Sequence, residues 1–510
     1  MAKNLGHMFL QILNNAELDQ IAMICKISNA SLTYNELLVN SLKIAKKMRD
    51  IGIERGDVVG FVSENRIEYC VSVIACFYLQ AVIHLMNPSY LKAELQQGFD
   101  KSKPKVVFTS KENFDKVIML QQETNYVETI FNFDVNYLDI TKDGLALKQI
   151  ELDPEISIER AIIINSSGTT GYPQSVVLTQ NNIHYAMEYL QDSYMQYKEK
   201  AKLVILPFCH ISGLFIVLDA LQKKSKLVIL SKFKPDLYCE IIQEHKIVSL
   251  ETVPTIATFL ARNPIIDKYN LTSVKNIVCG GAPLAQDIQN TILKKFNCQV
   301  RQLYGMTETC GLVMLAPIGE KWKVGSVGKP IPNIETKVVD PLTKKKLNCG
   351  ELGEICVKSG MNMKEYLGNI EATLAAFDEE GFFRTGDIGY FDKDGYFFIN
   401  DRLKDVIKYK GYQVLPVELE NMLLLHKDIV DAAVIGIADE RFGELPMAFV
   451  VKDKNSELNE EDVKYYIAVP IIERCSINKQ LHGGVKFVES IPRGATGKIL
   501  RRLLRETLKK

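Results

Sequence analysis

A loop rich in hydroxyl groups and glycine is the stretch of this chain best suited to phosphate chemistry. It spans residues 166–173, reads SSGTTGYP, and lies between the apolar runs 161–164 and 176–178, which predict buried strands. Glycine lets backbone N–H groups approach an anion closely, and hydroxyl groups add donors. This segment lacks the Gly-Lys-Ser/Thr ending of a Walker-type loop, and no helix is predicted directly after it. An ordinary P-loop NTPase is therefore disfavoured. Taken alone, the segment is equally compatible with a solvated turn.

Four further segments carry polar groups that could contact a nucleotide. Residues 304–309, YGMTET, combine an aromatic ring, a glycine, a hydroxyl group and a carboxylate, a set that could stack a base and hold a divalent cation. Asp387 ends a Thr-Gly-Asp turn and could accept hydrogen bonds from both hydroxyl groups of a ribose, or be a plain turn aspartate. The charged residues 401–412 and the glycine-rich residues 494–498 are compatible with solvated turns and a basic tail.

Composition excludes several other classes of protein. The chain has 510 residues, too many for one ordinary core, so a large domain and a smaller one are expected. Its 62 basic and 62 acidic residues cancel, which argues against a nucleic-acid partner. The 11 cysteines are scattered without a C-x-x-C pair, which favours reduced thiols over zinc or disulfides.

The sequence favours a cytoplasmic protein without a transmembrane segment. Residues 1–13 lack the features of a secretory signal, and the chain end, Leu508-Lys509-Lys510, is neither a peroxisomal nor a retrieval signal. The longest apolar run, 69–86, is interrupted by Gln80 and His84. It predicts a buried helix followed by a buried strand.

The pattern of apolar residues predicts α/β organisation from about 32 to 300, with strands such as 58–62 and helices such as 34–48. Closely spaced glycines over 325–396 indicate a β-rich subdomain. After residue 401 the pattern changes to a compact α+β module with helices at 416–425 and 460–469 and strands at 430–437 and 484–487. We therefore expect a large domain at 1–401 and a small domain at 402–510.

In this order the segments closely resemble the adenylate-forming superfamily of acyl-CoA synthetases, nonribosomal adenylation domains and beetle luciferases, over almost the whole chain. The run 401–414, DRLKDVIKYKGYQV, is particularly similar to 4-coumarate:CoA ligases and firefly luciferase. The resemblance implies an AMP-binding domain, a mobile C-terminal domain and a two-step reaction. A carboxylate and ATP form an acyl-adenylate and pyrophosphate, and a thiol or an oxygen species then reacts with the adenylate. ATP, Mg2+ and CoA are the implied cofactors, and a monomer or weak dimer is expected.

The resemblance also implies a role for individual residues. It makes Lys498, His210, Thr307 and Glu308 catalytic, with Glu308 holding Mg2+, and it makes Lys404 the hinge of the small domain. Nucleotide binding is implied for Ser166, Ser167, Gly168, Thr169, Thr170, Gly171, Gly281, Ala282, Tyr304, Gly305, Met306, Thr307, Asp387 and Arg402. The acyl pocket is implied for His210, Ser212, Gly280, Gly281, Gly311 and Leu312, and the CoA channel for Lys408, Lys410 and Gly411.

Three positions of the chain carry open questions. A lone histidine in an apolar run, such as His210, is commonly a core residue, but the resemblance favours a gate to the acyl site. Ser212 stands where coumarate ligases tend to carry an aromatic ring, which predicts a roomy, neutral pocket lined by small residues. Gln174 replaces the lysine of the family's P-K-G continuation, and the loss of a charge-assisted bond predicts a weaker hold on ATP.

Three hypotheses follow from the sequence. An ATP-dependent ligase joining a fatty or aryl carboxylic acid to CoA is favoured, because Lys498, Glu308, Asp387 and Arg402 are all present. A luciferase-like monooxygenase is the second, although residues 181–200 contain no arginine of the kind that beetle luciferases place near luciferin. A weakly active or non-catalytic nucleotide-binding protein, motivated by Gln174, is the third.

Overall fold

The structure is a computed structural model of the chain. It describes residues 4–137, 139, 160–166, 174–191, 200–320, 323–410, 412–468, 480–494 and 498–508. The expected phosphate-loop residues 167–173 and Gly411 lie outside this part of the chain.

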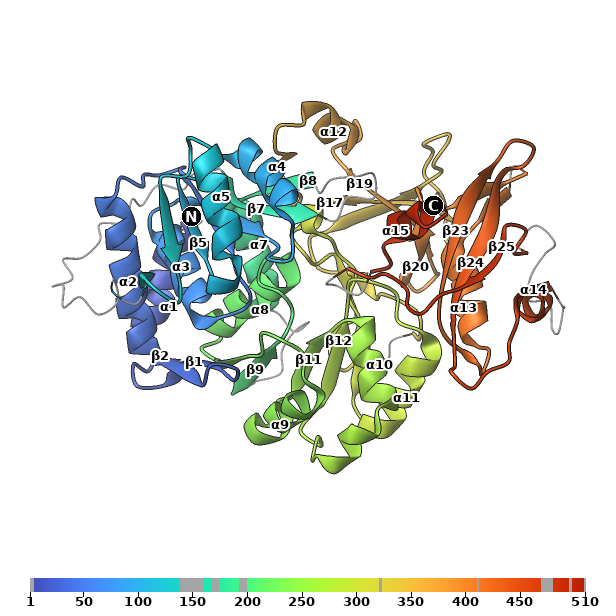
Figure 1. Cartoon of the computed structure of the whole chain (residues 1–510), viewed down its shortest axis with the longest axis horizontal. Helices are drawn as coiled ribbons and strands as arrows, with labels where there is room; N and C mark the ends of the chain where they lie inside the picture. Colours follow the sequence, from blue (N-terminus) through green and yellow to red (C-terminus); the bar gives the residue numbers. More distant parts are fainter. Residues whose placement is uncertain are drawn as a thin grey trace.

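A seven-stranded sheet forms the upper left of the molecule in Figure 1. Its order is β18 (Glu365–Tyr366), β8 (Gln174–Thr179), β7 (Arg160–Ser166), β4 (Val82–Met86), β3 (Val58–Val62), β5 (Val106–Thr109) and β6 (Thr129–Asn132). The strands from β7 to β6 are parallel, and β8 and β18 are antiparallel. The parallel strands are apolar because helices cover them. The helices in contact with the strands of this sheet are α3 (Ile67–Tyr78), α4 (Lys92–Ser102), α5 (Phe114–Glu123) and α7 (Gln180–Gln191), and α1 (Leu5–Asn14) and α2 (Tyr34–Asp50) pack on α3.

Local sequence explains where these helices begin and end. Thr33 and Glu36 form a capping box at the start of α2, and the buried positions of that helix repeat every three or four residues. The long apolar run is α3 followed by β4, with Gln80 at φ 51° in the turn between them. This confirms the expected buried helix and strand. Within the described part of the chain, no helix is long and apolar enough to cross a membrane.

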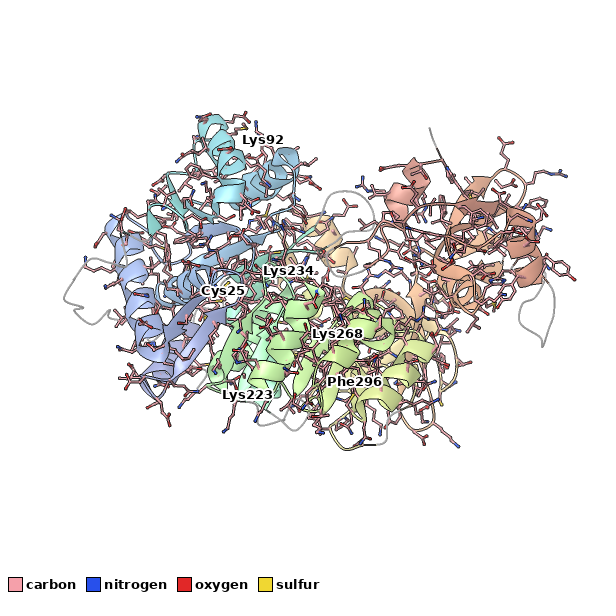
Figure 2. All side chains as sticks on the ribbon, turned by 60° about the horizontal axis from the view of Figure 1, so that its bottom comes forward. Cys25, Lys92, Lys223, Lys234, Lys268 and Phe296 are labelled. Carbon is pink, nitrogen blue, oxygen red and sulfur yellow. The ribbon has the colours of Figure 1, made fainter. Side chains whose placement is uncertain are left out.

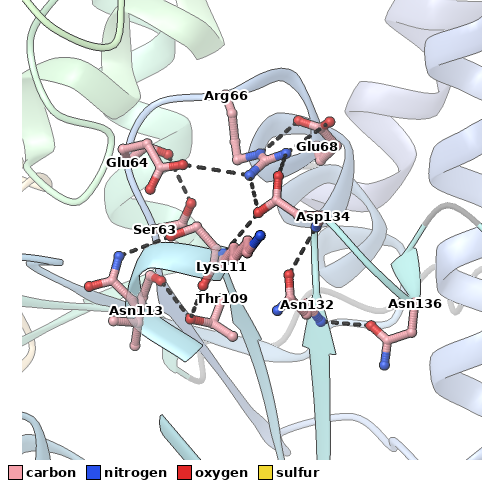
Figure 3. Close-up of polar contacts among 12 residues, drawn as sticks. Ser63, Glu64, Arg66, Glu68, Thr109, Lys111, Asn113, Asn132, Asp134 and Asn136 are labelled. Atoms are coloured by element: carbon pink, nitrogen blue, oxygen red, sulfur yellow. Dashed lines mark hydrogen bonds and ion pairs between the residues drawn. The ribbon is translucent and has the colours of Figure 1, made fainter. Parts of the chain in front are cut away.

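Ion pairs and a hydrogen bond connect the loops at the carboxyl ends of β3, β5 and β6 (Figure 3). The guanidinium of Arg66 is 2.9 Å from Oε2 of Glu68 and 2.9 Å from Oδ2 of Asp134. The same Asp134 oxygen accepts a hydrogen bond from the backbone N–H of Lys111 at 2.8 Å. The pairs fix the loop conformations and lie away from the cleft described below.

Two smaller sheets extend the large domain toward the bottom of Figure 1. One contains β2 (Ala30–Thr33), β1 (Ile21–Cys25), β10 (Lys226–Ile229) and β9 (Ala201–Val204), and the other contains β11 (Ser249–Thr252), β12 (Asn276–Cys279) and β13 (Gln299–Gln302). Their helices are α8 (Ile211–Gln222), α9 (Pro235–His245), α10 (Pro254–Arg262) and α11 (Gln286–Phe296). Except for β2, which is antiparallel, the paired strands in both sheets are parallel.

The expected β-rich subdomain follows. It contains β14 (Met314–Leu315) with β15 (Lys329–Pro330), then an antiparallel sheet of β16 (Glu335–Val339), β17 (Gly353–Lys358), β19 (Phe383–Phe391) and β20 (Phe397–Arg402), with the short helix α12 (Ile370–Ala375).

The C-terminal module occupies the right of Figure 1, in orange and red. Its sheet has the order β22 (Tyr412–Val414), β21 (Ile407–Tyr409), β24 (Gly443–Lys452) and β23 (Ile429–Asp439), with β25 (Gly484–Phe487) paired to β24. Its helices are α13 (Pro416–Leu424), α14 (Glu460–Ala468) and α15 (Arg501–Glu506). A large α/β domain with a β-rich subdomain and a small α+β domain is therefore confirmed, whereas the boundary at 401/402 stays a prediction.

Candidate functional site

A cleft of about 1880 Å³ lies between the large domain and the C-terminal module. Its walls bring together segments that are far apart in the sequence, from β7 and β8, α8, the 280–312 region, β19 and the C-terminal residues 498–505. The predicted site residues that line it are Ser166, His210, Ser212, Gly280, Gly281, Ala282, Tyr304, Gly305, Met306, Thr307, Glu308, Gly311, Leu312, Asp387, Arg402, Lys404 and Lys498. The structure thus gathers nearly all described candidates at one site, while their individual roles stay predictions.

Asp387 makes polar contacts with three neighbouring residues at the wall of this cleft. Strand pairing sets Asp387 opposite Arg402, and Arg402 Nε lies 2.8 Å from Asp387 Oδ1. The phenolic hydroxyl of Tyr304 donates a hydrogen bond to Asp387 Oδ2 at 2.8 Å. Thr385 Oγ1 accepts from the Asp387 backbone N–H at 3.1 Å. The carboxylate is therefore oriented before any ligand arrives, and its remaining lone pairs can accept from the hydroxyl groups of a ribose.

The segment 304–311 reverses tightly, and Gly305 is necessary for that. A Cβ atom at Gly305 would lie 2.0 Å from the carbonyl oxygen of Gly311. Backbone bonds between Tyr304 and Met314 hold the ring of Tyr304 at the wall of the cleft. Glycine at position 305 therefore allows the backbone of Gly311 to lie close to it. The sequence alone did not show which group this glycine accommodates.

Glu308 presents a carboxylate to the cleft beside Tyr366. The hydroxyl of Tyr366 donates to Glu308 Oε1 at 3.2 Å, and the Glu308 carbonyl accepts from the backbone N–H of Met363 at 2.7 Å. Among the described residues there is no cluster of three or more metal-ligating side chains. One carboxylate is nevertheless adequate for Mg2+ when phosphate oxygens and water complete the octahedron, so Glu308 fits this ion.

Lys498 reaches the cleft from the C-terminal module and is partly buried. Burial, together with the positive charge of Arg402, lowers the pKa of Lys498 from 10.5 to about 8, and Asp387 opposes that change. The ammonium group is thus electrostatically close to the Asp387 and Arg402 pair. A polyanion bound here would gain a cation from the opposite side of the cleft.

Ser166 and Gln174 mark the two ends of the expected phosphate loop. They are opposed in the antiparallel pairing of β7 with β8, and both line the cleft. Oε1 of Gln174 is buried without a hydrogen-bond partner.

His210 and the start of α8 line the part of the cleft where the acyl pocket is expected. His210 is the N-cap residue of α8, its Nε2 is buried without a partner, and burial lowers the pKa of the imidazole. A neutral imidazole cannot form an ion pair, so this side chain fits the expected role of a gate to the acyl site better than the role of a charged ligand. Gly311 has φ 99°, and a Cβ there would lie 3.3 Å from Cγ1 of Ile211, so glycine keeps this wall open.

The three remaining candidates differ in position. Lys404 is exposed in the turn after β20 and borders the cleft. Lys408 and Lys410 are exposed and do not line it, and the ammonium of Lys410 lies over the rings of Tyr409 and Phe442. In this arrangement the expected CoA-channel lysines are therefore away from the site.

Sequence reasoning missed several residues of the cleft. Tyr366 precedes the Gly368 turn, at φ 69°, and that aromatic-Leu-Gly pattern was the available signal. Lys202, Asp219 and Glu251 also line the cleft; the first two are buried and Glu251 is partly buried. The expected pocket of small neutral residues is thus incomplete, because one end of it is charged. For Lys202 and Asp219 the available signal was a charge in an otherwise apolar strand or helix, whereas the strand of Glu251 is mostly polar and gave no such signal.

The fold and the cleft define a class: enzymes that hold a nucleotide between a large α/β domain and a small C-terminal domain. The chain matches the family model described as AMP-binding enzyme over residues 11–367 and the AMP-binding enzyme C-terminal domain over residues 418–498. It belongs to this adenylate-forming family.

Relatives cover nearly the whole chain. A luciferin 4-monooxygenase of Nipponoluciola cruciata is 38% identical over 97% of this chain and 92% of its own length. The 4-coumarate-CoA ligase 1 of Narcissus pseudonarcissus is 34% identical over 96% of this chain and 91% of its own length.

A comparison with solved structures bears on the arrangement of the domains. ATP-bound MatB from Rhodopseudomonas palustris is 27% identical to this chain. The superposition covers 99% of each of the two chains and has a TM-score of 0.91. The apo structure of the same protein, whose superposition also covers 99% of each chain, has a TM-score of 0.78. The arrangement described here therefore matches the ATP-bound form more closely, in agreement with Lys498 lying in the cleft.

Proposed function

We propose that the protein is an AMP-forming ligase that activates a fatty or aryl carboxylic acid with ATP and transfers the acyl group to CoA. The observation that carries the proposal is the convergence of Lys498, Asp387 and Arg402 on one cleft that residues of α8 also line. The 4-coumarate-CoA ligase relatives support the same chemistry.

In the first step a carboxylate oxygen of the acid attacks the α-phosphorus of ATP. A new P–O bond forms, the bond to the bridging oxygen breaks, and pyrophosphate leaves. Asp387 would hold the ribose, and the ring of Tyr304 would lie against the adenine. Lys498 would stabilise the negative charge that grows on the phosphate oxygens. This is catalysis by positioning and electrostatics. Glu308 would hold Mg2+, which offsets the charge of the phosphates.

In the second step the CoA sulfur attacks the acyl carbonyl carbon, and AMP leaves with the electrons of the broken C–O bond. The exposed position of Lys408 and Lys410 supports a rotation of the small domain between the two steps, with Lys404 in the connecting turn. Such motions commonly order the half-reactions of an enzyme.

A luciferase-like reaction is the second candidate, favoured by the 38% identity to a luciferin 4-monooxygenase. Both reactions share the adenylate, so the adenylation site alone does not separate them.

The test is a pyrophosphate-release assay over a panel of fatty and aryl acids, with and without CoA, with light emission recorded in parallel. We expect acid-dependent pyrophosphate release and an acyl-CoA product that appears only with CoA. Light with luciferin and no acyl-CoA from any acid would favour the monooxygenase. Nucleotide binding without pyrophosphate release would leave only a binding protein.

A further inference from the structure

A buried ion pair in the small domain has no part in the reaction steps described above. Nη2 of Arg501, the first residue of α15, lies 2.9 Å from Oε1 and 3.2 Å from Oε2 of Glu420 on α13. The two side chains are 9% and 7% exposed. Both helices pack against β23 in the module at the right of Figure 2. The pair therefore joins α15 to α13 in the interior of the small domain.

Both carboxylate oxygens of Glu420 are engaged, which fixes the guanidinium in one place. Oε1 also accepts a hydrogen bond from the backbone N–H of Val434, on β23, at 2.8 Å. Burial raises the pKa of Glu420 to about 6, although Arg501 opposes that change, so this carboxylate is charged at neutral pH. The guanidinium is therefore held by an ionised partner that is itself anchored to a central strand.

The pair lies three residues beyond Lys498, and the backbone around that lysine is firmly held. The N–H of Gly494 donates to the carbonyl of Lys498 at 2.8 Å, and the N–H of Leu500 donates to the carbonyl of Pro492 at 2.8 Å. Leu500 is the N-cap residue of α15, so the helix begins directly after these bonds. A displacement of Arg501 would therefore be passed on to Lys498.

A second ion pair holds the other side of the same segment. Nη2 of Arg493 lies 2.8 Å from Oδ1 of Asp431, and Arg493 faces Ile499 in an antiparallel bridge. These two charged side chains are 28% and 27% exposed, so water screens their attraction. The buried pair of Glu420 and Arg501 is the firmer of the two anchors.

A buried ion pair of this kind contributes more to geometry than to stability. The desolvation of two charges offsets most of their attraction, so apolar side chains in the same place would stabilise the domain about as well. Charge-assisted hydrogen bonds, in contrast, have a preferred direction and hold the guanidinium in a defined position. A displacement of about 1 Å at a reacting group can lower a rate by about 100-fold. The position of Arg501 is therefore important for the reach of Lys498.

The pair also acts on the charge of Lys498. Burial is the main cause of the lowered pKa of this lysine, and the positive charge of Arg501 contributes to it. Glu420 compensates the charge of Arg501 and so limits this contribution. The other charges that act on the ammonium group are those of Arg402, Asp387 and Asp405.

We propose that the ion pair of Glu420 and Arg501 positions Lys498 for adenylation: Glu420 holds Arg501, and Arg501 holds the segment that presents the ammonium group to the cleft. This inference rests on the proposed ligase function, because it takes adenylation as the step that needs Lys498. Glu420 and Arg501 are positioning residues. The transfer of the acyl group to CoA does not use Lys498, so the pair should matter little in that step.

The two half-reactions of Glu420→Gln separate positioning from folding. Glutamine keeps the shape of the side chain and an acceptor for Val434, but it loses the charge that holds Arg501. We expect pyrophosphate release to slow by about tenfold to 100-fold. Transfer from a preformed acyl-adenylate to CoA should stay within about twofold of the wild-type rate. Arg501→Lys keeps the positive charge and should lose less in adenylation, again without a loss in transfer.

A surface ion pair on the same helix supplies the matched control. Nη1 of Arg502 lies 3.1 Å from Oε1 of Glu506, and the two side chains are 61% and 49% exposed. Glu506→Gln removes this pair with the same change of side chain. We expect wild-type rates in both half-reactions, because an exposed pair fixes little.

Chemical labelling of Lys498 tests the same pair without turnover. Acetic anhydride reacts with the neutral amine only, so the pH dependence of labelling, read by peptide mass spectrometry, reports the pKa of this lysine. In Glu420→Gln the charge of Arg501 is no longer compensated by its partner. Half-maximal labelling should therefore occur at a lower pH than in wild type, whereas Glu506→Gln should leave it unchanged.

Three results would overturn the inference: wild-type pyrophosphate release in Glu420→Gln, equal slowing of both half-reactions in that variant, or an unshifted labelling profile of Lys498. If Glu420→Gln does not fold, the two half-reactions of Arg501→Lys decide by the same comparison. Failure of the ligase proposal looks different. In that case wild type performs neither half-reaction with any acid, while the labelling comparison still decides whether the pair controls Lys498.

Discussion

The phenolic oxygen of Tyr304 lies 2.8 Å from Oδ2 of Asp387, although the two residues belong to different subdomains and are 83 positions apart. The hydrogen bond joins two residues that we expect to contact the base and the ribose of a nucleotide. Arg402 Nε lies 2.8 Å from the other oxygen of the same carboxylate. These side chains are therefore already oriented without a ligand, which would lower the entropic cost of binding.

Replacing Asp387 by Ala is expected to weaken ATP binding by about 1–3 kcal/mol, since two hydrogen bonds to the ribose are lost. Isothermal titration of ATP measures the change. Asp387→Asn, which keeps the shape of the side chain, should show a smaller loss. An ATP affinity equal to that of wild type in both variants would reduce Asp387 to a turn residue.

Replacing Tyr304 by Phe keeps the ring and removes the hydroxyl that orients Asp387. We expect a loss of about 0.5–1.5 kcal/mol in ATP affinity, smaller than for Asp387→Ala. Tyr465→Phe is the control, because Tyr465 is 70% exposed on α14. If Tyr304→Phe and Tyr465→Phe behave alike in titration, the hydrogen bond does not contribute to binding.

Lys498→Ala is expected to slow adenylation sharply while ATP still binds, because the ammonium acts mainly on the transition state. Burial, with Arg402, lowers the pKa of Lys498 to about 8, so the free enzyme loses this cation as the pH rises through that value. The kcat/KM for ATP should therefore fall above pH 8. In Lys498→Arg the charge persists, and this decline should disappear from the pyrophosphate-release profile even if the rate is lower.

Lys404→Pro is expected to restrict φ in the turn between β20 and β21 and to hinder rotation of the small domain. One half-reaction should then lose far more rate than the other. Pyrophosphate release reports the first, and transfer from a preformed acyl-adenylate to CoA reports the second. Lys404→Ala controls for the lost charge. Equal slowing of both half-reactions in the proline variant would contradict a hinge at this residue.

Gln174→Lys is expected to lower the KM for ATP, because a cation beside phosphate oxygens in a partly buried site attracts them more than an amide does. Gln174→Glu should raise the KM for the same electrostatic reason. Both are measured by pyrophosphate release with one acid at saturation. A KM insensitive to both substitutions would mean that Gln174 does not face the phosphates.

Most helices and strands of the small domain could be predicted from the sequence. Where the prediction failed, the failure has a physical cause. The predicted helix 416–425 is α13, and the predicted strand 484–487 has the bounds of β25. The long strand β24 was missed. It contains Pro446, which lacks the N–H that a central strand normally donates, so local propensity argued against a strand there. Pairing with β23 and β25 on its two sides overrides that preference.

In the site, local motifs were sufficient wherever neighbouring residues act together. Residues 304–309 and the Thr-Gly-Asp turn at Asp387 were identified because their chemistry is concentrated in a few positions. Tyr366 was missed because its partner, Glu308, is 58 residues away. Lys202 and Glu251 were missed at the cleft wall because they lie on β9 and β11, which are distant in the sequence, and neither strand by itself indicates that the two side chains meet.

The sequence by itself determined the family, the fold class and the chemistry offered at each motif, because these depend on periodicity and on the order of short segments. Only the tertiary structure decided which side chains meet. β9 and β11 are edge strands of two different sheets that lie in contact, which brings Lys202 to Glu251, and the position of the small domain brings Lys498 to Asp387 while keeping Lys408 out of the cleft. Such contacts arise from packing between distant segments, and no local pattern encodes them.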